Sequence, residues 1–193
     1  MFVLEGLLQK ILAGGASRRL GATARTLVGS IAHGDLVLDL GCGFATPLAA
    51  AGIAPIGVDI DEQRTRSLAS RGSRALVADA VALPFPDGIF TSVFSFGLLH
   101  HLNDENARRV IDEVLRVVQP NGLIAVFDGI TPRLGWRQPL PMLIRAADRG
   151  RHMRCESQLK GLFDGLSGWA FKRITYAITG LEGVWCVHSP GHA

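Results

Sequence analysis

The residues best suited to chemistry lie in the segment VLDLGCGFATPLA, residues 37–49. Asp39 stands in a run of apolar residues and is followed by two glycines, Gly41 and Gly43. Glycines let a backbone come close to a ligand. Pro47 suits the first turn of a helix, whose free N–H groups attract an anion. The segment therefore predicts a buried strand, a cofactor-binding loop and a helix, in that order.

Two further carboxylates follow the next predicted strands. Asp59 ends the strand 55–59, where a carboxylate can accept hydrogen bonds from both hydroxyls of a ribose. Asp79, next to Ala80, ends the strand 74–79 and is placed to accept a hydrogen bond from an exocyclic amine. Together they describe an adenosine. The alternatives are a helix cap for Asp59 and a plain turn residue for Asp79.

The loop does not suit a nicotinamide dinucleotide. Thr46 stands where the third glycine of the fingerprint G-x-G-x-x-G belongs. The carboxylate of Asp39 would repel a pyrophosphate but attract an ammonium or a sulfonium. S-adenosylmethionine carries both of these cations, an adenosine and one carboxylate. It is the cofactor that these residues favour.

Alternating strands and helices must position these side chains. Apolar runs predict strands over 36–40, 55–59, 74–79, 89–96 and 123–128, a helix over 104–118 and a turn at 119–122. This order is typical of a doubly wound α/β sheet with helices on both faces. We expect residues 35–193 to form one domain.

The two ends of the chain are expected to complete this domain. Residues 1–34 predict two helices, the second beginning at Ser17, which pack on the core or cap the site. Residues 129–193 are less regular. They predict helices near 138–149 and 156–167 and strands near 170–178 and 183–188.

Five segments resemble, in order and spacing, the successive motifs of class I S-adenosylmethionine-dependent methyltransferases. They are VLDLGCGFATPLA, GVDID, ADAVALPFPDGIF, FGLLHHL and EVLRVVQPNGLIAVFD, and they span about residues 36–128. The likeness is to the small-molecule branch, similar to ubiquinone and menaquinone C-methyltransferases (methyltransferase type 11). The resemblance implies a Rossmann-like, seven-stranded, mostly parallel sheet with an antiparallel last strand. It also implies that residues 129–168 form an insertion shaping the acceptor site.

The resemblance implies a set of cofactor-binding residues along the strand ends. The methionine end would be held by Asp39, Gly41, Cys42 and Gly43, the ribose by Asp59, the adenine by Ile60, Asp79 and Ala80, and the cleft toward the acceptor would be lined by Ser95 and Phe96. Ala45 and Thr91 depart from the family, which often has glycine and aspartate there. Ala45 fits if its φ is negative.

His100 and His101 follow the fourth strand on the side expected for the acceptor. Either could act as a general base, because a histidine titrates near neutral pH. The alternative is that one packs into the fold while the other is solvated.

Six arginines and a single acid lie between residues 133 and 154: Arg133, Arg137, Arg145, Arg149, Arg151 and Arg154, with Asp148. They could bind an anionic acceptor, acidic lipid or a partner, or form a solvated basic face. A net charge of +3 does not by itself imply nucleic acid. The segment after the fourth strand also lacks the Asn/Asp-Pro-Pro-Tyr/Phe motif that holds a flipped base, so we expect no nucleic-acid partner.

Three scattered cysteines predict a reducing environment, with no disulfide. No ligand spacing for a metal is present. Glycines and prolines interrupt the uncharged stretch 40–58, so we expect no transmembrane segment and a cytoplasmic protein. Our expectation is methyl transfer from S-adenosylmethionine, leaving S-adenosylhomocysteine, to a small molecule through O, N or C. The alternative is a catalytically silent cofactor-binding domain, and a homodimer is left open.

Overall fold

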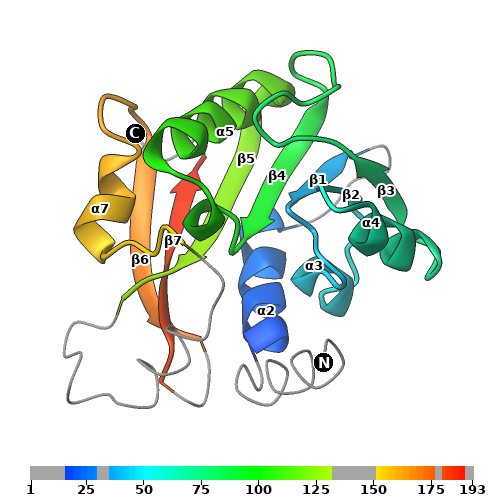
Figure 1. Cartoon of the computed structure of the whole chain (residues 1–193), viewed down its shortest axis with the longest axis horizontal. Coiled ribbons are helices and arrows are strands. Elements are labelled where there is room, and N and C mark those ends of the chain that lie inside the picture. Colours follow the sequence, from blue (N-terminus) through cyan, green and yellow to red (C-terminus); the bar gives the residue numbers. More distant parts are fainter. Residues whose placement is uncertain (1–15, 30–34, 132–150, 177–179, 190–193) are drawn as a thin grey trace.

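A seven-stranded sheet with the order β3-β2-β1-β4-β5-β7-β6 forms the centre of the computed structural model (Figure 1). The structure describes residues 16–29, 35–131, 151–176 and 180–189. The strands are β1 (Val37–Leu40), β2 (Ile56–Asp59), β3 (Arg74–Val77), β4 (Phe90–Phe96), β5 (Val118–Gly129), β6 (Trp169–Thr175) and β7 (Glu182–His188). Strands β1 to β5 pair in parallel, and β7 is antiparallel to both β5 and β6. The predicted doubly wound sheet with an antiparallel last strand is thus confirmed.

Helices cover both faces of the sheet. They are α2 (Ala16–Val28), α3 (Pro47–Ala50), α4 (Glu62–Ala69), the 3-10 helix η1 (Leu99–His101), α5 (Asp104–Val117) and α7 (Glu156–Gly161). On one face, α5 and α7 bury their apolar side chains in a cluster with Leu38, Leu40 and Val93. On the other, α2 and α3 pack with Val37, Phe94 and Trp185. Because successive strand residues point to opposite faces, the central strands β1, β4, β5 and β7 contribute side chains to both clusters.

The N-terminal helix α2 is part of the core. Its Leu20 and Ala24 are buried in the same cluster as Leu48 of α3. Gly21 lies so close to α3 that an added Cβ would stand 2.5 Å from the Pro47 carbonyl oxygen. The Arg25 guanidinium also donates to the Ala51 carbonyl at 2.8 Å. These contacts fix α2 against the loop that follows β1.

Four predicted elements differ from the structure by two residues or more. The strand expected over 74–79 ends at Val77, so Asp79 and Ala80 lie beyond it. Residues 119–122 form a bulge inside β5 instead of a turn, because Phe90 pairs with Val118 whereas Ser92 pairs with Leu123. The helix expected over 156–167 ends at Gly161, and the chain turns again at Gly165, whose φ is +85°. The strand expected over 170–178 ends at Thr175. The helices expected before Ser17 and over 138–149 lie outside the described residues.

None of the helices in the described ranges is long and apolar enough to cross a membrane. Across the same ranges, no group of three or more His, Cys, Asp or Glu side chains is arranged to hold a metal ion.

Candidate functional site

A cavity of about 290 Å³ lies at the carboxyl ends of β1, β4 and β5. Sheet order reverses between β1 and β4, where Leu40 pairs with Ser95, and such reversals are where open α/β sheets bind ligands. The β1 side contributes Asp39, Gly41, Cys42, Gly43, Ala45 and Pro47 to the wall, and the β4–β5 side contributes Phe96, Gly97, His100, Phe127 and Gly129. Leu20 of α2 and Tyr176, which follows β6, also line the cavity.

The loop after β1 is held open by its glycines. Gly41 and Gly43 have φ values of +72° and +59°, a region that favours glycine. The N–H groups of Gly41 and Cys42 both donate to the Val58 carbonyl, which ties the loop to β2. A Cβ added at Gly43 would meet no atom within 4 Å, so the space beside this residue is open. In the described part of the chain no residue other than glycine has a positive φ, so Ala45 meets the condition set for it.

Asp39 is a buried carboxylate that lacks a partner. Its side chain borders the cavity, the residue is 1% exposed, and neither oxygen has a hydrogen-bond partner among the described residues. Burial raises the pKa of Asp39 to about 7. The Thr46 hydroxyl is close enough to counteract part of the rise, although it does not reach hydrogen-bonding geometry, and the nearby Asp59 adds to the rise. A buried carboxylate without a partner is costly, and a cation bound in the cavity would remove that cost.

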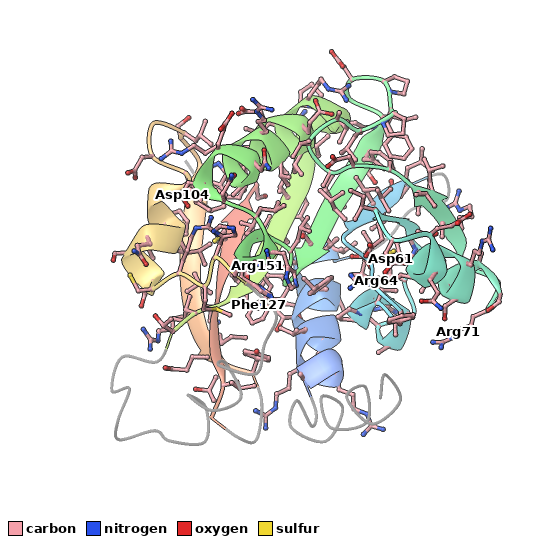
Figure 2. All side chains as sticks on the ribbon, viewed as in Figure 1. Asp61, Arg64, Arg71, Asp104, Phe127 and Arg151 are labelled. Carbon is pink, nitrogen blue, oxygen red and sulfur yellow. The ribbon has the colours of Figure 1, made fainter. Side chains whose placement is uncertain are left out.

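Asp59 joins the glycine loop to the start of α4. Its Oδ2 accepts from the Gly43 N–H at 3.0 Å and its Oδ1 from the Asp61 N–H at 3.0 Å. The Arg64 guanidinium lies 3.6 Å from Oδ2. Arg64 also lies next to Asp61 at the start of α4 (Figure 2). The N-cap of α4 is Asp61, which accepts from Gln63 N–H at 2.8 Å, so the helix-cap alternative for Asp59 does not hold. Each oxygen of Asp59 keeps a second acceptor position, which a ribose hydroxyl can use.

The residues expected to contact adenine lie outside the cavity. Ile60 is 70% exposed, the highest value among the exposed large apolar side chains of the described residues, and its free face could be covered by a flat ring. Asp79 is exposed and its Oδ1 accepts from the Val81 N–H at 3.1 Å, so it also shapes the turn. Ala80 is half-buried beside it. An adenosine held by these residues would lie along the surface, with only its far end in the cavity.

Of the residues expected at the end of β4, Phe96 lines the cavity and Ser95 does not. The Ser95 hydroxyl is buried and has no hydrogen-bond partner in the described part of the chain. Cys42 does line the cavity, and burial raises the pKa of its thiol to about 12. This thiol stays protonated at neutral pH, which agrees with a role for its backbone alone.

The two histidines of η1 lie in different surroundings. His100 is buried and lines the cavity, whereas His101 is exposed and stacks its ring 4.2 Å from that of His100. Both oxygens of the buried Asp128, near the end of β5, contact His100. One accepts from its backbone N–H at 3.0 Å, and the other lies 2.5 Å from its Nδ1. The sequence interpretation missed Asp128, although it ends the strand motif LIAVFD just as Asp59 ends β2.

Arg154 is a structural residue. Its buried guanidinium donates to the carbonyls of Leu99 and Leu102 at 2.7 and 2.8 Å and to Asp104 at 2.7 Å. Arg154 is therefore part of neither a solvated basic face nor an anion-binding site. Arg151 is exposed (Figure 2). The other arginines of the cluster, at 133, 137, 145 and 149, lie outside the described residues.

A family model described as a methyltransferase domain matches residues 38–126. The chain is 37% identical over 102 residues to a tRNA (carboxymethyluridine(34)-5-O)-methyltransferase of Arabidopsis thaliana, covering 50% of this chain and 24% of that protein. It is 35% identical over 124 residues to a demethylmenaquinone methyltransferase of Clavibacter sepedonicus, covering 60% and 47%. The chain thus spans less than half the length of either relative.

The fold has the same kind of relatives. A crystal structure of an S-adenosylmethionine-dependent methyltransferase from Thermotoga maritima superposes with a TM-score of 0.72 at 16% identity, and the match covers 97% of each chain. The glycine loop, the strand order and the segment matched by the family model all point to a methyltransferase domain. Residues 38–126 therefore match a methyltransferase domain, and the chain has the fold of a solved S-adenosylmethionine-dependent methyltransferase.

Proposed function

We propose that the chain transfers a methyl group from S-adenosylmethionine to a small molecule. The observation that carries the proposal is the Asp39 carboxylate, which is buried at the cavity wall without a partner. When bound, S-adenosylmethionine supplies an electrophilic methyl group on a cationic sulfur, together with an ammonium that can pair with a carboxylate. The open space beside Gly43 gives its amino-acid end room next to Asp39.

The remaining cofactor contacts follow the strand ends in order. Asp59 is suited to accept the ribose hydroxyls, and the exposed side chain of Ile60 is suited to pack against the adenine. Asp79 and the backbone of Ala80 would read the adenine edge. Because these residues stand outside the cavity, the cavity volume is left for the amino-acid end and the acceptor.

The cavity wall away from the glycine loop favours a small acceptor. Its side chains are Leu20, Phe96, Phe127 and Tyr176, with His100 as the polar exception. No lysine or arginine is among the described lining residues, whereas nucleic-acid binding depends on cations that contact phosphates. This supports a molecule with an apolar or aromatic body over the tRNA that is named for one partial relative. It gives no support to an anionic acceptor.

The chain's contribution to the reaction would be mainly alignment. Holding a nucleophile in line with the methyl group can lower the barrier by up to ~7–11 kcal/mol. The glycine loop and the aromatic side chains line the same cavity, which would hold the cofactor's amino-acid end and the acceptor next to each other.

The three cysteines support a reducing compartment, in line with a cytoplasmic location. Cys42, Cys155 and Cys186 are all free thiols. Disulfides are rare where the cell keeps thiols reduced.

Labelled S-adenosylmethionine incubated with the protein and separate pools of solvent-extracted metabolites and RNA tests the activity. We expect label in the metabolite pool. Label in RNA alone would make the acceptor a nucleic acid, and binding without transfer to any pool would favour the catalytically silent alternative.

Calorimetry with S-adenosylhomocysteine tests the ribose assignment. Asp59→Ala should weaken binding at least about 100-fold, because it removes charge-assisted hydrogen bonds to the ligand and the tie to Gly43. Asp112→Ala, an exposed aspartate on α5, is the control and should bind as the wild type does. Equal affinity of Asp59→Ala and wild type would remove Asp59 from the site.

A further inference from the structure

We propose that His100 and Asp128 act together on a hydroxyl-bearing acceptor, with His100 as the catalytic base and Asp128 as the residue that positions it. The inference rests on the proposed function and narrows it to O-methylation. It also separates the two histidines, because His101 is exposed and does not line the cavity.

The hydrogen bonds of Asp128 define the state of the His100 ring. Asp128 is 1% exposed, and its two oxygens contact the backbone N–H and the Nδ1 of the same residue. An ionised carboxylate only accepts hydrogen bonds, so Nδ1 carries the proton and Nε2 is the nitrogen that can take one up. The same carboxylate stabilises the imidazolium that forms after proton transfer.

The backbone around His100 is fixed from three directions. Arg154 donates to the carbonyls of Leu99 and Leu102, on either side of the histidine pair. The His152 N–H donates to the His100 carbonyl at 3.0 Å, and the Gly97 N–H donates to the Phe127 carbonyl at 2.8 Å. A base must be held in one place to be effective, and this imidazole is held at the wall that Asp39 and the glycine loop also form.

A histidine base positioned by an aspartate suits an acceptor that must lose a proton, such as a hydroxyl group. In the step we propose, an oxygen lone pair of the acceptor forms the new O–C bond. The C–S bond of the sulfonium breaks, its electrons stay on sulfur, and the hydroxyl proton passes to Nε2 of His100. The acceptor enters neutral, which agrees with a described lining of Leu20, Phe96, Phe127 and Tyr176 that lacks lysine and arginine. A hydroxyl on an apolar, ring-containing molecule fits both requirements.

The state of the ring can be measured without an acceptor. In the full chain labelled with 15N at histidine, the His100 signals, identified by their loss in His100→Gln, should show the proton on Nδ1 at pH 8. Asp128→Asn should shift the population toward the Nε2-protonated form. A wild-type ring protonated on Nε2 at pH 8 would overturn the proposal.

Methyl transfer to the extracted metabolite pool, with 13C-methyl S-adenosylmethionine, tests the catalytic role. We expect a labelled methyl ether, with kcat about 100-fold lower in His100→Gln and at least about tenfold lower in Asp128→Asn. The affinity of both variants for S-adenosylhomocysteine should stay within threefold of wild type, which also shows that they fold. The control is Asp112→Asn, an exposed residue of the same type as Asp128, which should react as wild type does.

The outcomes separate the two proposals. Transfer by the wild type with unchanged rates in His100→Gln and Asp128→Asn, or a product methylated on carbon, would overturn the His100–Asp128 assignment and leave the proposed function standing. No transfer by the wild type would overturn the proposed function, and this inference with it.

Discussion

Two aspartates with equal burial but opposite hydrogen bonding distinguish the two halves of the site. Asp39 of β1 and Asp128 of β5 are each 1% exposed. Asp39 has no hydrogen-bond partner among the described residues, whereas both oxygens of Asp128 contact His100. The β1 half therefore has a buried carboxyl group with which a bound cation could pair, whereas the carboxylate of the β5 half already has its partners. Burial is the same for the two carboxylates and does not distinguish the roles that we propose for them. Their hydrogen bonds differ, and it is on these that we base the distinction.

The largest effect is expected from Asp39→Asn, which should bind S-adenosylhomocysteine about 100-fold more weakly and yet be more stable. The pKa of Asp39 rises in the folded protein from 3.8 to about 7, so the folded state binds the extra proton and stability falls as pH rises from about 4 to about 7. At about 1.4 kcal/mol per pKa unit, the variant should gain up to about 4 kcal/mol at pH 8 and nothing near pH 4. Denaturant unfolding of both proteins at the two pH values measures this, and a variant less stable than wild type at pH 8 would contradict it.

Asp128→Asn should change stability in the opposite direction. It disturbs a carboxylate that already has its partners, which typically costs about 1–3 kcal/mol. Denaturant unfolding beside Asp112→Asn gives the comparison, since Asp112 is exposed and should change stability little. If Asp39→Asn and Asp128→Asn shifted stability in the same direction, the distinction between the two halves would fail.

A smaller effect is expected from pH on cofactor binding. Ionised Asp39 is the form that attracts the cation, so affinity for S-adenosylmethionine should rise on the order of tenfold between pH 5.5 and pH 7. Binding should also release a proton near pH 7, seen by calorimetry as a dependence of the heat on the ionisation enthalpy of the buffer. In Asp39→Asn, the pH dependence of the affinity and the buffer dependence of the heat should both largely disappear. If the variant kept them, a group other than Asp39 would be the one that titrates.

The smallest effect is expected from Ala45→Gly, which introduces the residue that the family resemblance leads us to expect there. The φ of Ala45 is already negative, so the extra freedom of glycine serves no purpose there. Affinity for S-adenosylhomocysteine should stay within twofold, with a loss of about 0.5–1 kcal/mol of stability from backbone entropy. Tighter binding by more than about tenfold would mean that the Ala45 methyl group obstructs the ligand.

The β1 half was predictable from sequence because its signals are local. The glycine loop, Asp39 and Asp59 fall within 21 residues, and the apolar runs that bracket them predict the strands closely. The β5 half depends on contacts between distant residues: His100 meets Asp128 28 positions later, and Arg154 meets Leu99 55 positions earlier. In the sequence, Arg154 belongs to the basic cluster by its charge alone. The sequence pattern around Arg154 carries no signal that its side chain is buried.

The bulge at 119–122 was missed for a related reason. Pro120, Asn121 and Gly122 are residues of a turn, and the local composition predicts one. Pairing with β4 keeps the segment in the strand and displaces the extra residues outward, so Gln119, Pro120 and Asn121 are exposed. The local composition predicted that the chain is irregular at 119–122. Pairing with β4 is what makes the irregularity a bulge and not a turn.

The position of Leu20 and Tyr176 in the cavity wall matters for exchanging parts between relatives. Both residues lie outside the matched segment 38–126, one before it and one after, as do Phe127 and Gly129. A chimera that swapped only the matched segment would carry over the glycine loop and leave the host's terminal elements around the acceptor. Selectivity would then follow the flanking sequence of the host, and a graft intended to move it would have to include α2, β6 and the end of β5.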